Sequence, residues 1–348
     1  MDQPGGPFSA AELFSLCRGE LAKRIAGQKE MMDGLLAALV AGGHVLLEGV
    51  PGLAKTLTVK SLAEITGLAF KRIQFTPDLL PADLTGTLVW EQGRGDFSVR
   101  RGPLFANVIL ADEINRAPAK VQSALLEAME EKQVTIGETS YPLPNPFFVL
   151  ATQNPIEQEG TYALPEAELD RFLVKLLVSY PSPEEEMDIV GRNARMGAPG
   201  GPALSVVLDA PALAGLREAA NAVLSDEKIA RYIVSLVSST RPLSTRSAAG
   251  LSGGVSGGSG GAGPVRLPKE GFYRHISYGA SPRASIALHR LSRIFALMEG
   301  RSFVTPEDVK AAAFPVLRHR VVLSYEAEAD GLDTDAVISR ILSLVPIP

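Results

Sequence analysis

Lys55 and Thr56 are the first residues whose types and position suggest chemistry, because they close a short loop that contains two glycines. The loop reads Gly-Val-Pro-Gly-Leu-Ala-Lys-Thr over residues 49–56 and follows an apolar run. Backbone N–H groups at Gly49 and Gly52 can converge on phosphate oxygens, while the lysine adds a positive charge and the threonine offers a hydroxyl to Mg²⁺. A helix is expected directly after the loop, and its N-terminal dipole also favours an anion. The pattern therefore predicts a phosphate-binding loop.

Position 54 departs from the usual pattern of such loops, G-x-x-x-x-G-K-[ST], which has glycine where this chain has Ala54. Alanine fits this position if its φ is negative at the start of the helix, because only a positive φ requires glycine. A phosphate-binding loop is therefore expected to hold Ala54 at negative φ. The alternative interpretation of residues 49–56 is a Gly-Pro turn followed by an ordinary amphipathic helix.

A second chemical signal, Asp112-Glu113, follows the apolar run at residues 107–111. A strand this apolar is buried on both faces, so its first solvated position is its carboxyl end, where ligands of open α/β sheets bind. Asp112 is expected to hold the Mg²⁺ water shell opposite Thr56, and Glu113 to polarise the attacking water as a general base. Alone the pair is weak support, because an acidic loop after a core strand looks the same. Its position downstream of the phosphate loop favours nucleotide hydrolysis.

Length and composition allow a large buried core and exclude several classes of protein. The chain has 348 residues, of which 46% are apolar and 21% charged, as is ordinary for a soluble protein of two domains. Its net charge of −5 disfavours a dedicated nucleic-acid binder. The single cysteine, Cys17, rules out an internal disulfide and fits a reducing, cytoplasmic compartment. No secretion signal is expected at the N-terminus, and the apolar stretch 35–50 is too short to span a bilayer.

The order of the predicted elements indicates an α/β fold. Strand candidates alternate with helical stretches, which implies a parallel sheet flanked by helices. Two β-prone segments that contain glycines, residues 84–103 and 133–139, are predicted to form hairpin inserts. Ser9 and Glu12 form a capping box at the start of the first helix. The predicted strands are the run before the phosphate loop and residues 70–75, 108–112, 147–152 and 173–178.

Pro181-Ser182-Pro183 marks a predicted boundary between an α/β domain, residues 1–180, and a helical domain, residues 181–348. In the helical domain, Thr305 precedes Pro306 and two acids, which is typical of a helix start. A stretch rich in Gly and Ser, at about residues 244–271, is predicted to be a flexible loop. It is either a tether for a partner or a tolerated surface insertion.

With these features and the Ala-Thr-Gln-Asn-Pro run at 151–155, the chain resembles an AAA+ ATPase, and the MoxR family in particular. The resemblance implies a P-loop NTPase core with hairpin inserts and a C-terminal helical lid. It also explains Ala54, because MoxR-like loops commonly carry alanine there. The Gly/Ser stretch before Gly279 departs from the family pattern. The matching stretches are residues 46–56, 111–118, 151–155, 164–172 and 279–283.

The resemblance implies roles for side chains that lie outside the loop. Asn154 is similar to the polar sensor that orients the attacking water beside Glu113, and the alternative is an Asn-Pro turn. Arg171 resembles the arginine finger that reaches the γ-phosphate of the adjacent subunit. The alternative for Arg171 is an ion pair within the chain, with Glu168 or Asp170.

Two further residues complete the implied site. Arg283 resembles the second sensor, which contacts the γ-phosphate from within the same subunit, and the alternative is a solvated arginine in a first helical turn. Gln28 is expected to line the adenine pocket. The alternative is that this part of the chain only contributes residues to the apolar core, which would look the same in the sequence. The expected nucleotide-contacting residues are Gln28, Gly49, Val50, Pro51, Gly52, Leu53, Ala54, Lys55, Thr56 and Leu57.

The function implied by the resemblance is an ATP-hydrolysing motor that uses Mg²⁺, assembles as a homo-oligomeric ring, a hexamer, and remodels or matures partner complexes as a chaperone. Family partners are typically proteins with von Willebrand factor A domains. The alternatives are a motor subunit like that of magnesium chelatase and a nucleotide-gated binding switch without motor function. A DNA motor is disfavoured, because no basic stripe with interleaved aromatics accompanies Arg94, Arg100 and Arg101.

Overall fold

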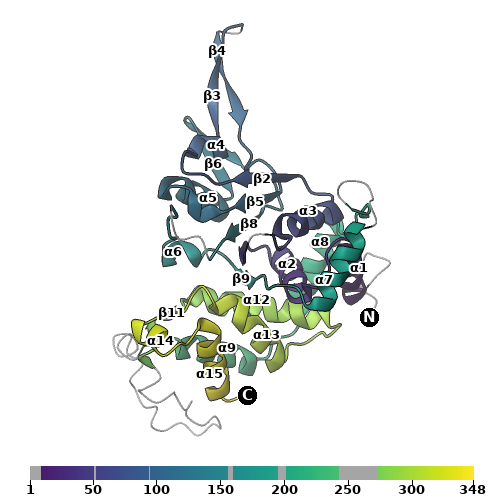
Figure 1. Ribbon diagram of the computed structural model, residues 1–348, viewed down its shortest axis with the longest axis vertical. Helices are drawn as coiled ribbons and strands as arrows, with labels where there is room; N and C mark the ends of the chain where they lie inside the picture. Colours follow the sequence, from purple (N-terminus) through teal and green to yellow (C-terminus); the bar gives the residue numbers. More distant parts are fainter. Residues whose placement is uncertain (1–8, 51, 94, 156–159, 195–200, 243–272) are drawn as a thin grey trace. The chain divides into compact units, whose positions relative to one another are not determined.

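The chain forms two compact units, Met1–Ala219 and Ala220–Pro348. Their structure comes from a computed structural model that describes residues 9–50, 52–93, 95–155, 160–194, 201–242 and 273–348. The first unit contains a sheet with helices on both sides, and the second is mainly helical (Figure 1). The predicted combination of an α/β core and a helical C-terminal part is confirmed. Among the described helices, none is long and apolar enough to cross a membrane.

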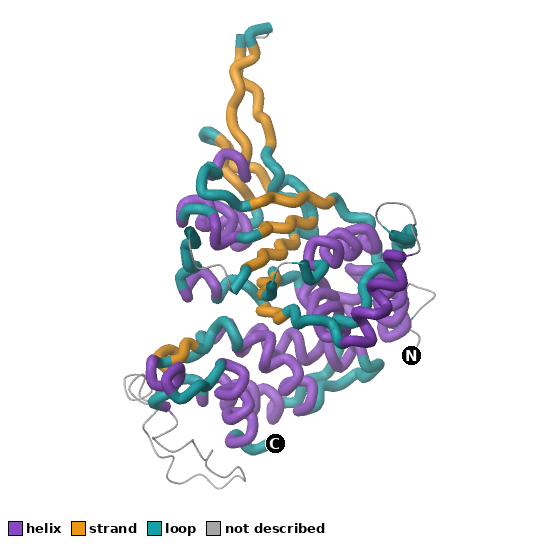
Figure 2. Tube along the Cα trace, in the orientation of Figure 1, coloured by secondary structure: helices purple, strands orange, loops and turns teal. Residues whose placement is uncertain are grey.

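The sheet of the first unit has five parallel strands in the order β2-β5-β8-β1-β9, which run side by side in Figure 2. All five strands lie where the sequence predicts a strand, with ends that differ by a residue or so from the expected bounds. In a parallel sheet every strand ends at the same edge, so the loops that follow β1, β5 and β8 lie together. The strands are β1 (Val45–Glu48), β2 (Phe70–Gln74), β5 (Val108–Asp112), β8 (Phe148–Gln153) and β9 (Val174–Leu177).

Helices cover both faces of this sheet, which is why the apolar strand β5 is buried along its whole length. On one face, Ile109 and Ala111 of β5 pack with Val121 and Leu125 of α5 in a single apolar cluster. On the other side of the sheet in Figure 1, α3 contacts β5 and α2 contacts β9. The helices are α1 (Ala10–Ala22), α2 (Lys29–Ala41), α3 (Lys55–Thr66), α5 (Ala119–Glu131) and α6 (Glu166–Leu169), with a 3-10 turn, η1 (Ile114–Arg116).

The start of α1 confirms the predicted capping box. The Ser9 N–H donates to Glu12 Oε2 at 2.7 Å, and the Glu12 N–H donates to Ser9 Oγ at 3.3 Å. Cys17 lies on the inner side of this helix and is fully buried. It is therefore a core residue, as expected for a small apolar side chain.

Both predicted hairpins are present in the first unit. Gly86 begins the first hairpin at a φ of 103°, and a Cβ there would lie 2.3 Å from the Arg100 carbonyl oxygen, so only glycine fits. This hairpin projects away from the rest of the unit in Figure 1. The second hairpin turns at Gly137, as the sequence predicts. The elements are α4 (Pro81–Thr85), β3 (Gly86–Glu91), β4 (Asp96–Arg101), β6 (Gln133–Ile136) and β7 (Thr139–Pro142).

The two units divide later in the chain than the boundary that the sequence suggests at residue 180. The reason is that α7 (Pro183–Ala194) and α8 (Ala210–Ala222) are tied to the first two helices. Arg192 Nη1 donates to the Ala22 carbonyl at 2.8 Å, and Arg217 Nε donates to the Val40 carbonyl at 3.2 Å. Residues 181–219 therefore belong to the first compact unit.

The second unit is built from helices with one short two-stranded sheet. Thr305 and Asp308 form a capping box at the start of α13, where the sequence predicts the start of a helix, and Arg301 Nη1 donates to Asp308 Oδ2 at 2.7 Å. The Gly/Ser stretch at about 244–271 lies outside the described residues. The elements are α9 (Glu227–Ser239), β10 (Ile276–Tyr278), α12 (Pro282–Met298), α13 (Pro306–Leu317), β11 (Val322–Leu323), α14 (Tyr325–Ala329) and α15 (Thr334–Leu344).

Candidate functional site

The loop at residues 49–56 connects β1 to α3 at the carboxyl edge of the sheet. Gly49 is required by packing, because a Cβ there would lie 2.7 Å from the Val178 carbonyl oxygen. Gly52 is required by its backbone, which has a φ of 87°. Glycine is thus required at the two positions for different reasons. Pro51, between them, lies outside the described residues.

Ala54 does not have the negative φ that the sequence led us to expect. Its φ is 54°, in the left-handed region, and it caps the N-terminus of α3. Its carbonyl nevertheless starts the helix, since it accepts hydrogen bonds from the Thr58 N–H at 2.9 Å and from Thr58 Oγ1 at 3.1 Å. The expectation was wrong because the loop turns into the helix through this residue. Alanine at this position therefore carries backbone strain that glycine would not.

A cavity of about 400 Å³ lies beside the loop and brings together residues from three separate parts of the chain. Lys55 and Thr56 reach it from the start of α3, Asp112 and Glu113 from the end of β5, and Asn154 from the residue after β8. These are five of the residues singled out by sequence, and the common edge of the parallel strands explains why they meet. The remaining described residues of the lining are Gly52, Ala54 and Leu57.

A second, larger cavity of about 620 Å³ also borders the loop, and it shares Gly52, Ala54 and Leu57 with the first. Gln28 lines it, with a left-handed φ of 54° and a side-chain Nε2 that donates to the Ser179 carbonyl at 2.8 Å. Its wall is more apolar than that of the first cavity. The other described residues of the wall are Lys23, Arg24, Ile25, Ala26, Leu53, Pro181, Ile189, Arg192, Gly201 and Pro202.

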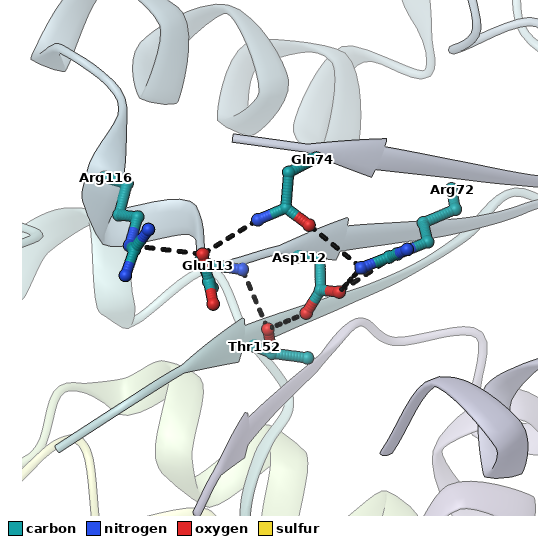
Figure 3. A network of polar contacts seen from close by, with 6 residues as sticks. All are labelled: Arg72, Gln74, Asp112, Glu113, Arg116 and Thr152. Atoms are coloured by element: carbon teal, nitrogen blue, oxygen red, sulfur yellow. Dashed lines mark hydrogen bonds and ion pairs between the residues drawn. The ribbon is translucent and has the colours of Figure 1, made fainter. Parts of the chain in front are cut away.

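Asp112 is the most buried carboxylate of the site and is held on both of its oxygens (Figure 3). Thr152 Oγ1 donates to Asp112 Oδ1 at 2.6 Å. Arg72 of β2 donates to Asp112 Oδ2 twice, from Nε at 3.0 Å and from Nη2 at 2.6 Å. These bonds fix the carboxylate at the end of β5 and balance its charge.

Glu113 has a left-handed φ of 57°, which is unusual for a residue with a side chain. Its N–H donates to Thr152 Oγ1 at 2.8 Å, which helps to hold this backbone. Its Oε2 accepts a hydrogen bond from Gln74 Nε2 at 2.8 Å and pairs with Arg116 Nε at 3.1 Å (Figure 3). Strained backbone of this kind is concentrated at functional sites.

Lys55 is half-buried, and its Nζ donates to the Gly49 carbonyl at 2.6 Å. Burial lowers the pKa of this ammonium, while the charges of Asp112, Glu113 and Glu48 act in the opposite direction. The lysine is therefore held inside the loop by a neutral acceptor. An anion at the cavity would be a stronger partner for it.

The oxygen donors at the cavity suit Mg²⁺ bound together with phosphate. The Thr56 hydroxyl and the Asp112 carboxylate line the same cavity. Among the described residues, no cluster of three or more His, Cys, Asp or Glu side chains could cage a metal ion. Mg²⁺ typically keeps several waters and takes one or two protein ligands with substrate phosphates, so the donor set fits this ion.

Arg171 and Arg283 lie in other parts of the chain. Arg171 Nε pairs with Glu130 Oε2 of α5 at 2.7 Å, beside the acids Glu127 and Glu168. Arg283 is in the first turn of α12, exposed, and belongs to the second unit. Its contact with a nucleotide stays a prediction, as does the role of Arg171 toward a neighbouring subunit.

Sequence reasoning missed the partners of the two acids, Arg72, Gln74, Arg116 and Thr152. A signal for two of them was available, because alternation along β2 places Arg72 and Gln74 on one face and Ile73 on the other. Two polar residues on one face of a strand in an α/β sheet are unusual, since such strands are mostly apolar. The sequence does not show which strand pairs with β2, and therefore which side chains Arg72 and Gln74 contact.

Comparison with known proteins agrees with this geometry. Residues 44–174 match the model of the ATPase family associated with various cellular activities (AAA), and residues 274–341 match that of the AAA lid domain. The chain is 45% identical to chaperone MoxR1 of Mycobacterium tuberculosis over 99% of its own length and 86% of that protein. The chain belongs to the MoxR family of AAA ATPases.

Two further similarities extend over nearly the whole chain. Protein MoxR of Methylorubrum extorquens is 32% identical, with 94% of this chain and 93% of that protein covered. A protein from Cytophaga hutchinsonii, known from a crystal structure at 2.00 Å and assigned provisionally as an ATPase, is 45% identical. The TM-score with that structure is 0.83, over 97% of this chain and 96% of the other. The predicted resemblance to MoxR proteins is confirmed.

Proposed function

We propose that this MoxR protein binds ATP with Mg²⁺ beside the loop at residues 49–56 and hydrolyses it to ADP and phosphate. The observation that carries the proposal is the cavity of about 400 Å³, where a lysine, a hydroxyl, two carboxylates and a carboxamide converge. These are the groups that phosphoryl transfer to water needs, in one place and from three strand ends.

Each side chain of the cavity has a distinct task in this proposal. Lys55 exchanges the Gly49 carbonyl for phosphate oxygens and neutralises part of their charge. Glu113 takes the proton of the attacking water on its carboxylate, as a general base. Asn154 orients that water through its side-chain amide. The left-handed backbone of Glu113 at the wall of the cavity supports this role, because strained backbone is concentrated at functional sites.

Thr56 and Asp112 are the residues that would hold the metal. Bound Mg²⁺ supplies charge neutralisation for the phosphate oxygens. Thr56 contributes its hydroxyl, and Asp112 accepts hydrogen bonds from metal-bound water. The bond from Thr152 Oγ1 keeps Asp112 aimed at the cavity.

The second cavity is proposed to receive the nucleoside. Its volume of about 620 Å³ and its apolar wall suit a purine ring, and it adjoins the phosphate loop. Gln28 lies in its wall at the start of α2. Leu53 and Leu57 would then contact the base from the loop side, together with Val50 of the predicted set.

Two arginines are proposed to make hydrolysis depend on assembly and on the lid. Arg171 acts as a finger toward the γ-phosphate of a neighbouring subunit in a ring, which we take to be a hexamer. Arg283 contacts the nucleotide of its own subunit and reports whether ATP or ADP is bound. The membership of the family supports both roles. The position of Arg171 away from its own loop also supports a role in trans.

The work done with this hydrolysis is proposed to be chaperone-like remodelling or maturation of partner complexes in the cytoplasm. The name of the Mycobacterium tuberculosis relative, chaperone MoxR1, supports this class of activity. Proteins with von Willebrand factor A domains are the proposed partners. Pull-down with a Glu113→Gln variant in the presence of ATP tests this, because a motor stopped before hydrolysis retains its partners.

The hydrolytic proposal is tested by separating ATP binding from turnover. Lys55→Ala should abolish ATP binding in isothermal titration, whereas Glu113→Gln should bind ATP normally and release no phosphate. Lys60→Ala, on an exposed position of the same helix, is a matched control that should leave both unchanged. Equal loss of ATP affinity in the Lys55 and Glu113 variants would contradict the roles. Normal binding with no turnover in the unaltered protein and its partners would favour a binding switch.

A further inference from the structure

Strand β2 carries two polar side chains into the candidate site from the side opposite the phosphate loop. In the parallel register, Gln74 is the neighbour of Asp112 and Arg72 is the neighbour of Leu110. Register neighbours and every second residue along a strand share a face, so Arg72, Gln74 and Asp112 lie on the same face of the sheet. Figure 3 shows their side chains linked in one chain of polar contacts.

Arg72 and Thr152 bind different oxygens of the Asp112 carboxylate. Thr152 occupies Oδ1, and both Nε and Nη2 of Arg72 donate to Oδ2. The Asp112 side chain is 13% exposed, so its charge needs a partner, whereas the Arg72 side chain is 49% exposed and can move away. The guanidinium is thus a positive charge in direct contact with Asp112.

We propose that Arg72 is a displaceable counter-ion of Asp112 that competes with Mg²⁺, so that it sets how strongly nucleotide binding depends on the metal. The proposal rests on the proposed binding of ATP with Mg²⁺ at this site. Asp112 can accept hydrogen bonds at Oδ2 from Arg72 or from metal-bound water, and two N–H groups already occupy the lone pairs there. Binding of metal-bound water at Oδ2 therefore requires Arg72 to give up these bonds.

Displacement of Arg72 would also affect Glu113, because Gln74 is hydrogen-bonded to both residues. Arg72 Nη2 donates to Gln74 Oε1 at 2.9 Å, and Gln74 Nε2 donates to Glu113 Oε2 at 2.8 Å. The bond from Arg72 fixes which way the amide of Gln74 points, because its oxygen faces the guanidinium and its NH₂ faces Glu113. When Arg72 leaves Asp112, this orientation loses its support.

The experiment compares ATP affinity with and without the metal, which requires no turnover. Isothermal titration with ATP is carried out in excess Mg²⁺ and again in EDTA, and the ratio of the two dissociation constants is the readout. Arg72→Met keeps an apolar stem and removes the donors, so the ratio of the dissociation constant in EDTA to that in Mg²⁺ should increase by about threefold to fivefold, the upper end of the range for an exposed ion pair. Arg72→Lys, which keeps the charge without the two-donor fork, should give an intermediate ratio.

Lys71→Met is the matched control, because it removes the same charge from the adjacent position of β2, whose side chain is exposed on the other face. Its ratio should stay within about twofold of the unaltered protein, since exposed charges beyond a few ångströms are screened by salt. An unchanged or smaller ratio in both Arg72 variants overturns the proposal. An equal rise in the Lys71 variant also overturns it, because net charge would then explain the effect. Absence of ATP binding by the unaltered protein would instead refute the proposed function.

Discussion

Ala54 offers a direct test of the backbone of the phosphate loop. This residue caps α3 with a φ of 54°, although it carries a Cβ. Replacing it with glycine should stabilise the first unit, because glycine adopts this conformation without the clash between Cβ and the backbone. The change removes little packing, since Ala54 is exposed at the rim of both cavities.

Two opposing effects set the size of the gain. A left-handed conformation costs an L-residue about 1–2 kcal/mol, and glycine removes this cost. Glycine also gives the unfolded chain more freedom, which destabilises the folded state by about 0.4–1 kcal/mol. The strain is the larger effect, so Ala54→Gly should raise the free energy of unfolding by about 0.5–1 kcal/mol.

Urea denaturation followed by far-ultraviolet circular dichroism measures this difference. Ala214→Gly is the matched control, because Ala214 is exposed in the interior of α8, within the same compact unit. The identical substitution there should lower the free energy of unfolding by about 1 kcal/mol, since helical alanine has no strain to lose. The two variants should therefore shift the midpoint in opposite directions. If both destabilise the protein by the same amount, Ala54 is not strained in the native loop.

Two further predictions concern pH and assembly. Burial lowers the pKa of His44 to about 4, so the unfolded chain binds a proton first as the pH falls. The contribution of His44 to the free energy of unfolding is complete above about pH 6.5 and decreases by up to about 3 kcal/mol toward pH 4. His44→Asn should flatten this part of the pH dependence of urea midpoints, and an unchanged slope would contradict the assignment. For Arg171, a mixture of inactive Lys55→Ala and Arg171→Ala subunits should recover phosphate release, because one interface then has both an intact loop and a finger worth about 10³ to 10⁵ in rate. Inactivity of every mixture whose subunits demonstrably exchange would exclude a finger acting in trans.

Local patterns in the chain were sufficient for the architecture and for most of the candidate site. Asp112 and Glu113 could be placed because a wholly apolar strand must be buried and its first polar residues must lie at its end. Lys55 and Thr56 followed from the glycine-containing loop that they close, and Asn154 followed from the resemblance to MoxR proteins. The hairpins were predictable for another reason, because Gly86 and Gly137 occupy backbone conformations that local sequence signals well.

The side-chain contacts of the two acids could not be predicted from the sequence, because they depend on which strands become neighbours. Arg72 lies 40 residues before Asp112 and Gln74 lies 39 before Glu113, and only the pairing of β2 with β5 brings them together. The same is true of Arg171. The alternative to a finger was an ion pair with its sequence neighbours Glu168 or Asp170, whereas the ion pair that the structure shows is with Glu130 of α5.

Residue types and spacing alone thus determined that this chain forms an α/β core with a glycine-containing loop and two acids at one sheet edge, because burial and strand direction act locally. Only the tertiary structure decided the charge partners of those acids and the left-handed backbone of Ala54 and Glu113. Ion pairs form between side chains that packing brings close. A backbone dihedral in a loop depends on where the following helix must dock. Packing of the core therefore determines both the ion pairs and these dihedrals.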